Sequence, residues 1–345
     1  MGQLGFFDAD KRLMALSAKG DPLEAIDGLV PWESFRSDLE AAVLTPEAER
    51  KSAAGRKPTD VILLFRMLIL QSLYNLSDEQ VEYQVRDRLS FTRFLTSGIE
   101  DCIPDGTTLW LFREKLGKAG IIEKLFDRFD RHLGAKGYIA RGGQIVDATI
   151  VAVPKQRNTH KENETVKGGQ TPEAWKKRPA KNRQKDKDAR WTKKHGRSFY
   201  GYKNHVNADA KHKLIRCYDV SDAAVHDSQK LDGLLSKANT SADVFADSAY
   251  RSAETEAALK ARGFRSRIHV RATRNHPLTQ RQVEANRKKS RVRVRVEHVF
   301  GAQETSAGSR LVRTIGIVRA RVKIGLQNLV YNIRRLVTLE RMAAV

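Results

Sequence analysis

The sequence predicts an α/β fold, in which helices flank a mixed β-sheet, preceded by a mainly helical N-terminal domain. Two observations predict this fold. Up to about residue 135 the apolar residues recur at helical spacing, whereas from residue 144 onward β-branched runs alternate with helical segments. Strands and helices in such an order are typical of a sheet with helices on its faces. The predicted domains are residues 1–135 and 136–345.

The composition is that of a globular protein, apart from a large net positive charge. The 345 residues include 63 Lys+Arg and 41 Asp+Glu, a formal net charge of +22, and 40% of them are hydrophobic. This composition excludes collagen, coiled coil and wholesale disorder. Because such a charge attracts phosphate backbones, nucleic acid is the expected partner.

Local sequence patterns exclude a membrane-spanning helix and a zinc site built on cysteines. The most apolar run, VILLFRMLIL, contains Arg66 in its middle, so no helix that spans a bilayer is expected. Cys102 and Cys217 stand alone, without Cys-x-x-Cys spacing, which excludes a zinc site built on cysteines. These patterns predict a cytoplasmic protein that does not bind membranes.

The N-terminal domain is expected to contain four well-marked helices. Residues 58–76 are apolar around most of a helical circumference, which predicts a buried helix. Ser77 and Gln80 form a capping-box pattern that opens a second helix. Residues 108–116 and 121–134 have the spacing of two more.

Cations lie on the predicted outer faces of these helices: Arg86, Arg88, Arg93, Arg113 and Lys115. Helices joined by short turns with such a rim are typical of a helix-turn-helix DNA reader. They are equally typical of an ordinary helical bundle with a solvated rim. The sequence leaves both interpretations open.

The second domain begins with residues 144–154, QIVDATIVAVP, a β-branched run typical of a central strand. The elements expected after it are hairpin strands over 197–208 and 212–223, a helix over 227–238, a strand over 243–250, a helix over 254–263, a strand over 264–271, a helix over 290–304 and a C-terminal helix over 319–341. This order is also that of a ribonuclease-H-like core.

Residues 155–198, between the first two predicted strands, are expected to form a basic loop. They carry 15 Lys/Arg against 5 Asp/Glu, with too few apolar residues to fold alone. We therefore expect a mobile segment that a partner orders. Trp175 and Trp191 can either stack on exposed bases or dock on the domain, and docking is the commoner fate of a tryptophan.

Two aspartates stand in unusual places. Asp147 lies inside the apolar strand, where an ionised carboxylate is costly without a compensating charge, and Asp247 ends a later strand. Functional side chains gather at strand ends in an open α/β sheet, so the two carboxylates are expected to share one cleft. A divalent cation, Mg²⁺ above all, would relieve their repulsion. Each aspartate alone also fits a structural role, bonded to backbone amides or to an arginine.

Residues 290–304, SRVRVRVEHVFGAQE, fit either a strand or a helix. As a helix, the segment places Arg293 and Glu297 four residues apart, beside an apolar stripe that includes Val296 and Phe300. As a strand, it would leave Glu297 among valines without a partner. The helix is therefore predicted, with Glu297 at the rim of the cleft.

The segments IVDATIV, FYGYKNHV, VFADSAYRS and RVRVEHVFG, in this order, resemble the DDE transposases of bacterial insertion sequences, and most closely the group typified by insertion sequence five. The resemblance extends over nearly the whole chain and includes PDGTTLWLFREKL. It implies a ribonuclease-H-like catalytic domain in which Asp147, Asp247 and Glu297 bind two Mg²⁺ ions, with Mn²⁺ as a substitute. It also implies a bacterial, nucleoid-associated protein.

The last block departs from the family pattern, which has Tyr, Arg, Glu and Lys at fixed spacing. Arg293 and Glu297 match, but Ser290 stands at the tyrosine position and Glu304 at the lysine position. The phosphate-binding role of that lysine is therefore left to a neighbouring cation. The candidates are Arg287, Lys288, Lys289 and Arg310.

Further DNA contacts are expected from Arg293, from Lys203 on the strand next to the first aspartate, and from Lys193 and Lys194 in the basic loop. For Arg293 an ion pair of purely structural value is a close alternative. The implied function is Mg²⁺-dependent cleavage of double-stranded DNA at terminal inverted repeats and strand transfer into a target, by a homodimer or larger assembly. The alternatives are a DNA-binding protein that no longer cuts, derived from a transposase, and a general nuclease.

Overall fold

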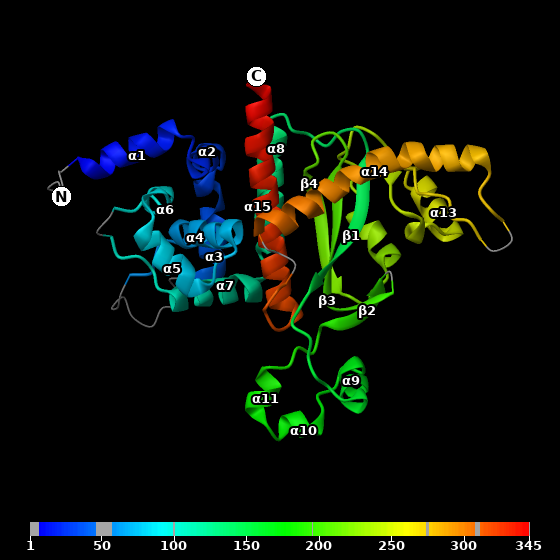
Figure 1. Cartoon of the computed structure of the whole chain (residues 1–345), viewed down its shortest axis with the longest axis horizontal. Helices are drawn as coiled ribbons and strands as arrows, with labels where there is room; N and C mark the ends of the chain where they lie inside the picture. Colours follow the sequence, from blue (N-terminus) through cyan, green and yellow to red (C-terminus); the bar gives the residue numbers. More distant parts are fainter. Residues whose placement is uncertain are drawn as a thin grey trace. The chain divides into compact units, whose positions relative to one another are not determined.

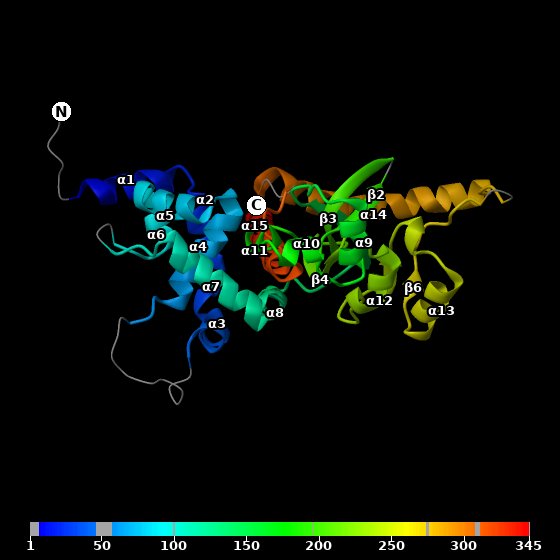
Figure 2. The ribbon, with the colours of Figure 1, turned by 90° about the horizontal axis from the view of Figure 1, so that it is seen from below.

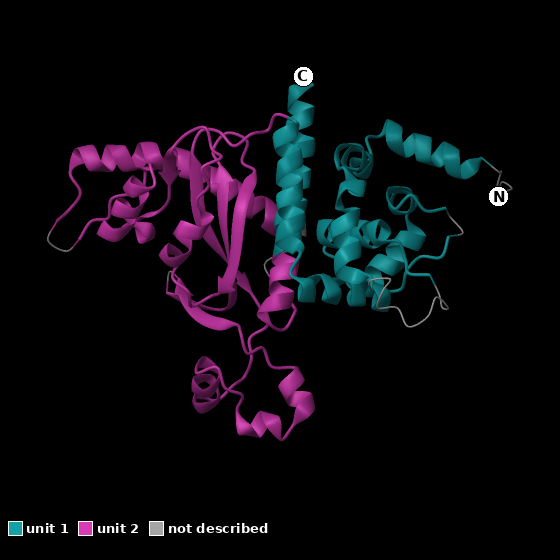
Figure 3. Cartoon of the chain, turned by 180° about the vertical axis from the view of Figure 1, so that it is seen from behind, with its two compact units in different colours: residues 1–136, 325–345 teal, residues 137–324 magenta. Residues whose placement is uncertain are grey.

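The computed structural model describes residues 7–45, 57–98, 101–194, 196–273, 276–307 and 311–344. It divides the chain into two compact units, residues 1–136 with 325–345 and residues 137–324 (Figure 3). The division after Lys136 lies one residue from the predicted one. The C-terminal segment differs from the prediction, because residues from Gly325 onward group with the N-terminal helices. The amphipathic pattern revealed a helix there, α15 (Ile317–Ala343), but not the core that its apolar face joins.

Unit 1 is helical throughout its described part. Besides the end of α15, its elements are α1 (Asp8–Ala18), α2 (Pro22–Leu29), η1 (Trp32–Phe35), α3 (Arg36–Val43), α4 (Val61–Tyr74), α5 (Asp78–Asp87), α6 (Leu89–Phe94), α7 (Gly106–Ala119) and α8 (Ile122–Ala135). The predicted capping box of Ser77 and Gln80 is confirmed at the start of α5. Among the described residues no single helix is long and apolar enough to cross a bilayer; only α4 and α5 taken together, bent by 100°, meet the test of length and composition.

The cations of the predicted rim are engaged within unit 1. Arg113 donates to Asp78 at 2.6 Å, and Arg93 donates to Asp21 at 2.6 Å. An acidic neighbour, an aromatic ring or a backbone carbonyl engages the others: Arg86, Arg88 and Lys115. These contacts support the ordinary bundle for these five side chains, since each has a partner within unit 1.

Unit 2 is built on a six-stranded mixed sheet (Figure 1). Its strands are β1 (Gln144–Ala152), β2 (Arg190–Lys194), β3 (Arg197–Asp209), β4 (Ile215–Asp222), β5 (Asp243–Phe245) and β6 (Arg265–Ser266). The order is β2-β3-β1-β5-β6, with β4 also paired to β3. β1 runs antiparallel to β3 and parallel to β5, and β5 runs parallel to β6. The predicted mixed α/β architecture is confirmed, although β5 and β6 are shorter than expected.

Helices cover both faces of this sheet. They are η3 (Asp227–Lys230), α12 (Leu231–Leu234), η4 (Ser248–Tyr250), α13 (Ala253–Ala261) and α14 (Gln280–Ala307). Consecutive strand residues point to opposite faces. Val146 packs in one cluster with Leu231 of α12 and Leu259 of α13, whereas Asp147 contacts Arg293 of α14. α12 and α13 therefore lie on one face and α14 lies on the other (Figure 2).

The basic segment is folded within its described residues, contrary to the prediction of a mobile loop. It contains α9 (His160–Lys167), α10 (Glu173–Lys176) and α11 (Pro179–Arg183), followed by β2. The three helices stand together, away from the sheet (Figure 1). We call residues 155–189 the helical lobe. Its core depends on one side chain, Trp175, which is 0% exposed, and a count of apolar residues does not reveal such a core.

We expect Trp175→Ala to open the helical lobe. Removing a fully buried tryptophan costs about 3 kcal/mol or more, and little else fills this small core. Limited proteolysis should then cut within residues 155–189 faster than in the wild type. Trp191→Ala is the matched control, because Trp191 is 43% exposed on β2, and equal proteolysis of both variants would contradict the assignment.

Candidate active site

Asp147 lies in the middle of β1, on the sheet face that α14 covers. Its side chain is 16% exposed. One carboxylate oxygen, Oδ2, accepts from Arg293 Nη1 at 2.7 Å, and Oδ1 accepts from the Ala148 N–H at 2.8 Å. The charge that the sequence placed in an apolar strand is therefore compensated by a guanidinium group.

Arg293 and Glu297 lie one turn apart on α14. The predicted helix is confirmed there, and the strand interpretation is wrong. Arg293 Nη2 donates to Glu297 Oε1 at 3.5 Å while Nη1 holds Asp147, so one guanidinium connects the two carboxylates. α14 packs against β1 and β5, which places Glu297 at the edge of this face with 59% of its side chain exposed.

Asp247 follows β5, the parallel neighbour of β1. It is the N-cap of η4, where its Oδ1 accepts from the Ala249 N–H at 2.8 Å. Its charge reaches Asp147 electrostatically. The structural alternatives considered for both aspartates are thus also present: one pairs with an arginine and the other caps a turn.

Burial dominates the electrostatics of Asp147. It raises the pKa of this carboxyl above its ordinary value, against the opposing effects of Arg293 and of the Ala148 N–H, and the charge of Asp247 adds to the rise. Burial and the negative charge of Asp247 both disfavour the ionised form of Asp147, so a cation beside this carboxylate is stabilising. At present the cation at Asp147 is Arg293.

The donor chemistry of the site suits a hard divalent ion. Carboxylate oxygens are the ligands that Mg²⁺ prefers, and the Arg293 guanidinium marks where positive charge is stabilised. Over the part of the chain that the structure describes, no three His, Cys, Asp or Glu side chains converge closely enough to hold a metal. The residue types therefore fit Mg²⁺, but loading would require Arg293 to release Asp147 and the three carboxylates to move closer together.

Four of the cations predicted to contact DNA have exposed side chains. Lys193 and Lys194 lie at the end of β2, and Lys194 acts electrostatically on Asp147. Arg287 and Lys288 lie on α14 before the Arg293 turn. All four have charged groups available for phosphate.

Two other predicted DNA contacts are engaged internally. Lys203 on β3 is 12% exposed, donates to the Val225 carbonyl at 2.7 Å and lies 2.9 Å from Asp227. Lys289 donates to the Ile268 carbonyl at 2.8 Å, and burial lowers its pKa. The sequence revealed these charges but not the carbonyl groups that bind them.

Ser290 and Glu304, which depart from the family pattern, both lie on α14. Ser290 Oγ lies 3.3 Å from Nε2 of His269, and Glu304 is exposed. Arg310, one of the candidate substitutes for the missing lysine, lies outside the described residues. Arg287 and Lys288 are the candidates with exposed side chains.

Tyr250 is a buried residue, missed by the sequence reasoning, that feels the charge of the candidate carboxylates, although its ring packs with Val146 and Leu231 on the sheet face opposite to α14. Its side chain is 1% exposed, and its hydroxyl has no hydrogen-bond partner in the described part of the chain. Burial raises its pKa well above the ordinary value, and the charges of Asp147, Asp227 and Asp247 raise it further. Its position three residues after Asp247 could have indicated that it lies near the candidate carboxylates, but an aromatic residue at that position is equally typical of the hydrophobic core.

Buried His205 predicts a loss of stability in acid. Burial lowers its pKa from 6.5 to about 4, so the unfolded chain takes up its proton first as the pH falls. The stability contributed by neutral His205 is complete above the unfolded pKa and declines by about 3 kcal/mol as the pH falls to the folded value. Denaturant unfolding across this window should show a shallower pH slope in His205→Gln than in the wild type. His160→Gln, at an exposed site, should keep the wild-type slope; a shallower slope there too would contradict this origin.

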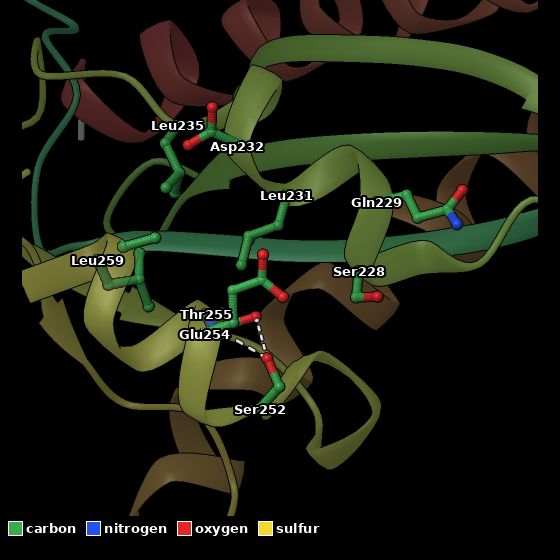
Figure 4. Close-up of a pocket in the computed structure, with 10 residues that line it drawn as sticks. Ser228, Gln229, Leu231, Asp232, Leu235, Ser252, Glu254, Thr255 and Leu259 are labelled. Carbon is green, nitrogen blue, oxygen red and sulfur yellow. Dashed lines mark hydrogen bonds between the residues drawn. The ribbon is translucent and has the colours of Figure 1, made fainter.

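A separate pocket of ≈ 390 Å³ lies between the η3–α12 segment and α13 (Figure 4). Ser228, Asp232, Ser252 and Glu254 are among its lining residues, and Ser252 Oγ bonds to Thr255 Oγ1 at 2.9 Å. None of the candidate carboxylates or predicted DNA contacts lines it. The pocket is thus distinct from the Asp147 site.

Two family models match this chain. The model described as "Transposase DDE domain" matches residues 140–333, more than half of the chain and all three candidate carboxylates, and the model described as "Transposase domain (DUF772)" matches residues 11–115. A cryo-EM structure of a piggyBac transposase synaptic complex with hairpin DNA is similar at 12% identity, over 93% of this chain and 73% of that chain, with a TM-score of 0.45. The family matches alone decide the assignment.

Proposed function

Since the chain belongs to the family of transposases with a DDE domain, we propose that it catalyses Mg²⁺-dependent cleavage at the terminal inverted repeats of an insertion sequence and transfer of the freed strands into target DNA. The arrangement of Asp147, Arg293 and Glu297, with Asp247 in electrostatic range, is the observation that supports this proposal most strongly. Within the family, the group typified by insertion sequence five is the proposed subgroup.

The proposed catalytic fold is ribonuclease-H-like. Without β2, the strand order is β4-β3-β1-β5-β6, with β3 the only strand antiparallel to both of its neighbours. That topology places Asp147 on the central strand and Asp247 at the end of the adjacent parallel strand. The same strand order therefore supports both the ribonuclease-H-like fold and the proposed position of the two aspartates.

Asp147, Asp247 and Glu297 are the residues proposed to hold two Mg²⁺ ions, for which Mn²⁺ can substitute. When bound, such ions supply Lewis acidity for in-line displacement at phosphorus. The chain's own part is to hold its carboxylates at fixed positions: β1 fixes Asp147, the turn after β5 fixes Asp247 through its bond to Ala249, and α14 carries Glu297. Arg293 restrains Asp147 and Glu297 until the ions are bound.

DNA is the proposed partner, as a duplex at the element ends and at the target. The proposed phosphate contacts are Lys193 and Lys194 on β2, which pairs with β3, and Arg287 and Lys288 on α14, which packs against β1, since all four are exposed. Arg293, which was also predicted to contact DNA, is proposed to reach phosphate only after releasing its carboxylates. A homodimer or larger assembly is proposed because two ends must be held together.

One observation favours a second candidate, a DNA-binding protein that does not cut. The Arg293 guanidinium occupies Asp147, and the described residues contain no ready metal-binding group. If this pairing persists on DNA, the protein would bind ends without cleaving them.

An end-cleavage assay separates the two candidates. The purified chain is incubated with a duplex that carries the inverted repeat from the DNA flanking its gene, with Mg²⁺, with Mn²⁺ or with EDTA. The proposal expects nicks at the repeat boundary with either metal and none in EDTA, followed by joining of the 3′ ends to a second duplex. Binding without nicks supports the second candidate, and nicks without joining support a general nuclease.

A further inference from the structure

In the helical lobe most acidic side chains accept internal hydrogen bonds, whereas most basic side chains are exposed. Three of its five acids, Glu162, Asp186 and Asp188, serve as internal acceptors. Glu162 accepts from Trp175 Nε1 at 2.5 Å and from the Thr159 N–H at 2.8 Å; the Thr159 bond is the main cause that lowers the pKa of Glu162 to about 2. The carboxylate therefore stays ionised inside the lobe.

The other two internal acids fix the lobe to the body of unit 2. Asp186 is 2% exposed and accepts from the Tyr202 hydroxyl at 2.7 Å and from the Gly316 N–H at 3.2 Å. Asp188 Oδ2 accepts from the Ile317 N–H at 2.8 Å. The C-terminal end of the lobe is thus attached to β3 and to the start of α15 by charge-assisted hydrogen bonds, which are stronger than neutral ones.

The cations of the lobe, in contrast, face solvent. The exposed ones are Lys155, Arg157, Lys161, Lys167, Lys176, Lys177, Arg178 and Arg183, whereas Glu164 and Glu173 are its only exposed acids. No large hydrophobic side chain of residues 155–189 is exposed. The surface therefore lacks the aromatic or aliphatic anchors that protein partners and membrane interfaces require.

A path of basic residues leads from this surface to the candidate active site. The lobe continues directly into β2, which carries Lys193 and Lys194, and Lys194 acts electrostatically on Asp147. Trp191 also lies on β2, and the Lys155 ammonium group lies over its ring, 5.9 Å from the ring centroid. Exposed cations therefore continue along the chain from the lobe to the end of β2, where Lys194 acts on Asp147.

From the charge sorting, the attachment at the C-terminal end of the lobe and the cations that continue onto β2, we infer that the helical lobe is a docking surface for the phosphate backbone of duplex DNA next to the site of cleavage. The inference rests on the proposed function in that this duplex is the DNA to be cut. The surface offers charge without base-reading geometry, so the contact is independent of sequence. Its attachment to β3 and α15 holds the duplex at a fixed position relative to Asp147.

The test replaces three exposed cations that have no ion pair in the described structure, in the variant Lys177→Gln/Arg178→Gln/Arg183→Gln. The matched control is Lys211→Gln/Lys237→Gln/Lys260→Gln, which removes the same charge from exposed, unpaired positions elsewhere in unit 2. Binding of the full chain to a labelled duplex of arbitrary sequence is measured in EDTA, by anisotropy, over a series of salt concentrations. Protease resistance of the lobe verifies that each variant is folded.

The lobe variant should bind about tenfold or more weakly, with a salt slope smaller by about 2 to 3, because each lost phosphate contact removes about 0.9. The control should keep the wild-type slope. Wild-type affinity and slope in the lobe variant, or an equal loss in the control, would overturn the inference. In the wild type, DNA should also protect Lys161 and Lys177 from acetylation, and their continued reactivity would overturn it as well.

The metal-free assay keeps this inference separate from the proposed function. A wild type that binds through the lobe but never nicks its end duplex with Mg²⁺ would contradict the proposed function alone. A wild type that nicks and joins, combined with a lobe variant that binds normally, would contradict the inference alone.

Discussion

Replacing Asp147 by asparagine is expected to abolish strand cleavage while DNA binding remains. The substitution removes one carboxylate from the proposed metal site, and loss of about 4 kcal/mol of metal-assisted stabilisation corresponds to about a 10³-fold slower reaction. Binding to an end duplex in EDTA should be unchanged, because the proposed phosphate contacts lie on other side chains. Nicking with Mg²⁺ and binding without it are the two measurements.

The same variant should be folded and more stable than the wild type at neutral pH. The pKa of Asp147 is raised in the folded chain, so its ionised form disfavours folding once the pH exceeds the ordinary value. Asparagine keeps the shape of the side chain and an oxygen to accept from Arg293. Asp222→Asn is the isosteric control on β4 of the same sheet and should cut normally. If Asp147→Asn cuts as well as the control does, Asp147 is not part of the site.

The parts of the site that could be predicted are those where one residue violates a local rule. A charge inside IVDATIV is costly, and a lone glutamate beside an apolar stripe at helical spacing needs a reason, so the sequence indicates Asp147 and Glu297 as candidates. Arg293 was evident only as the neighbour of Glu297. Its stronger bond, to Asp147, joins residues 146 positions apart, and no periodicity encodes such a pair.

What could not be predicted depends on single long-range contacts. The helical lobe is organised by Trp175 and the Glu162 carboxylate, while its composition resembles that of a disordered segment. The apolar stripe of α15 predicts a helix that packs on a core, but it does not identify which of the two units contains that core. The unusual hydroxyl of Tyr250 has no signal in the sequence, because burial rather than residue type leaves it without a hydrogen-bond partner among the described residues.

Arg293→Gln should destabilise the protein by about 2 to 3 kcal/mol in the absence of divalent metal, because it leaves the largely buried Asp147 without its cation. Arg293 lowers the pKa of Asp147, so its contribution is present when the carboxylate is ionised and is lost as the pH falls. The difference between wild type and variant should therefore shrink in acid. Denaturant unfolding in EDTA at several pH values measures it.

Two comparisons make the Arg293 prediction specific. In an Asp147→Asn background, Arg293→Gln should cost much less, since the two residues act through one contact. Arg291→Gln, two residues earlier on α14, exposed and without an ion pair in the described structure, should change stability by less than about 0.5 kcal/mol. Mg²⁺ should then stabilise Arg293→Gln more than the wild type, because an ion that binds only the folded chain no longer competes with the guanidinium for Asp147. Equal stabilisation of both proteins by Mg²⁺ would mean that the ion binds elsewhere and that Arg293 restrains nothing that the metal needs.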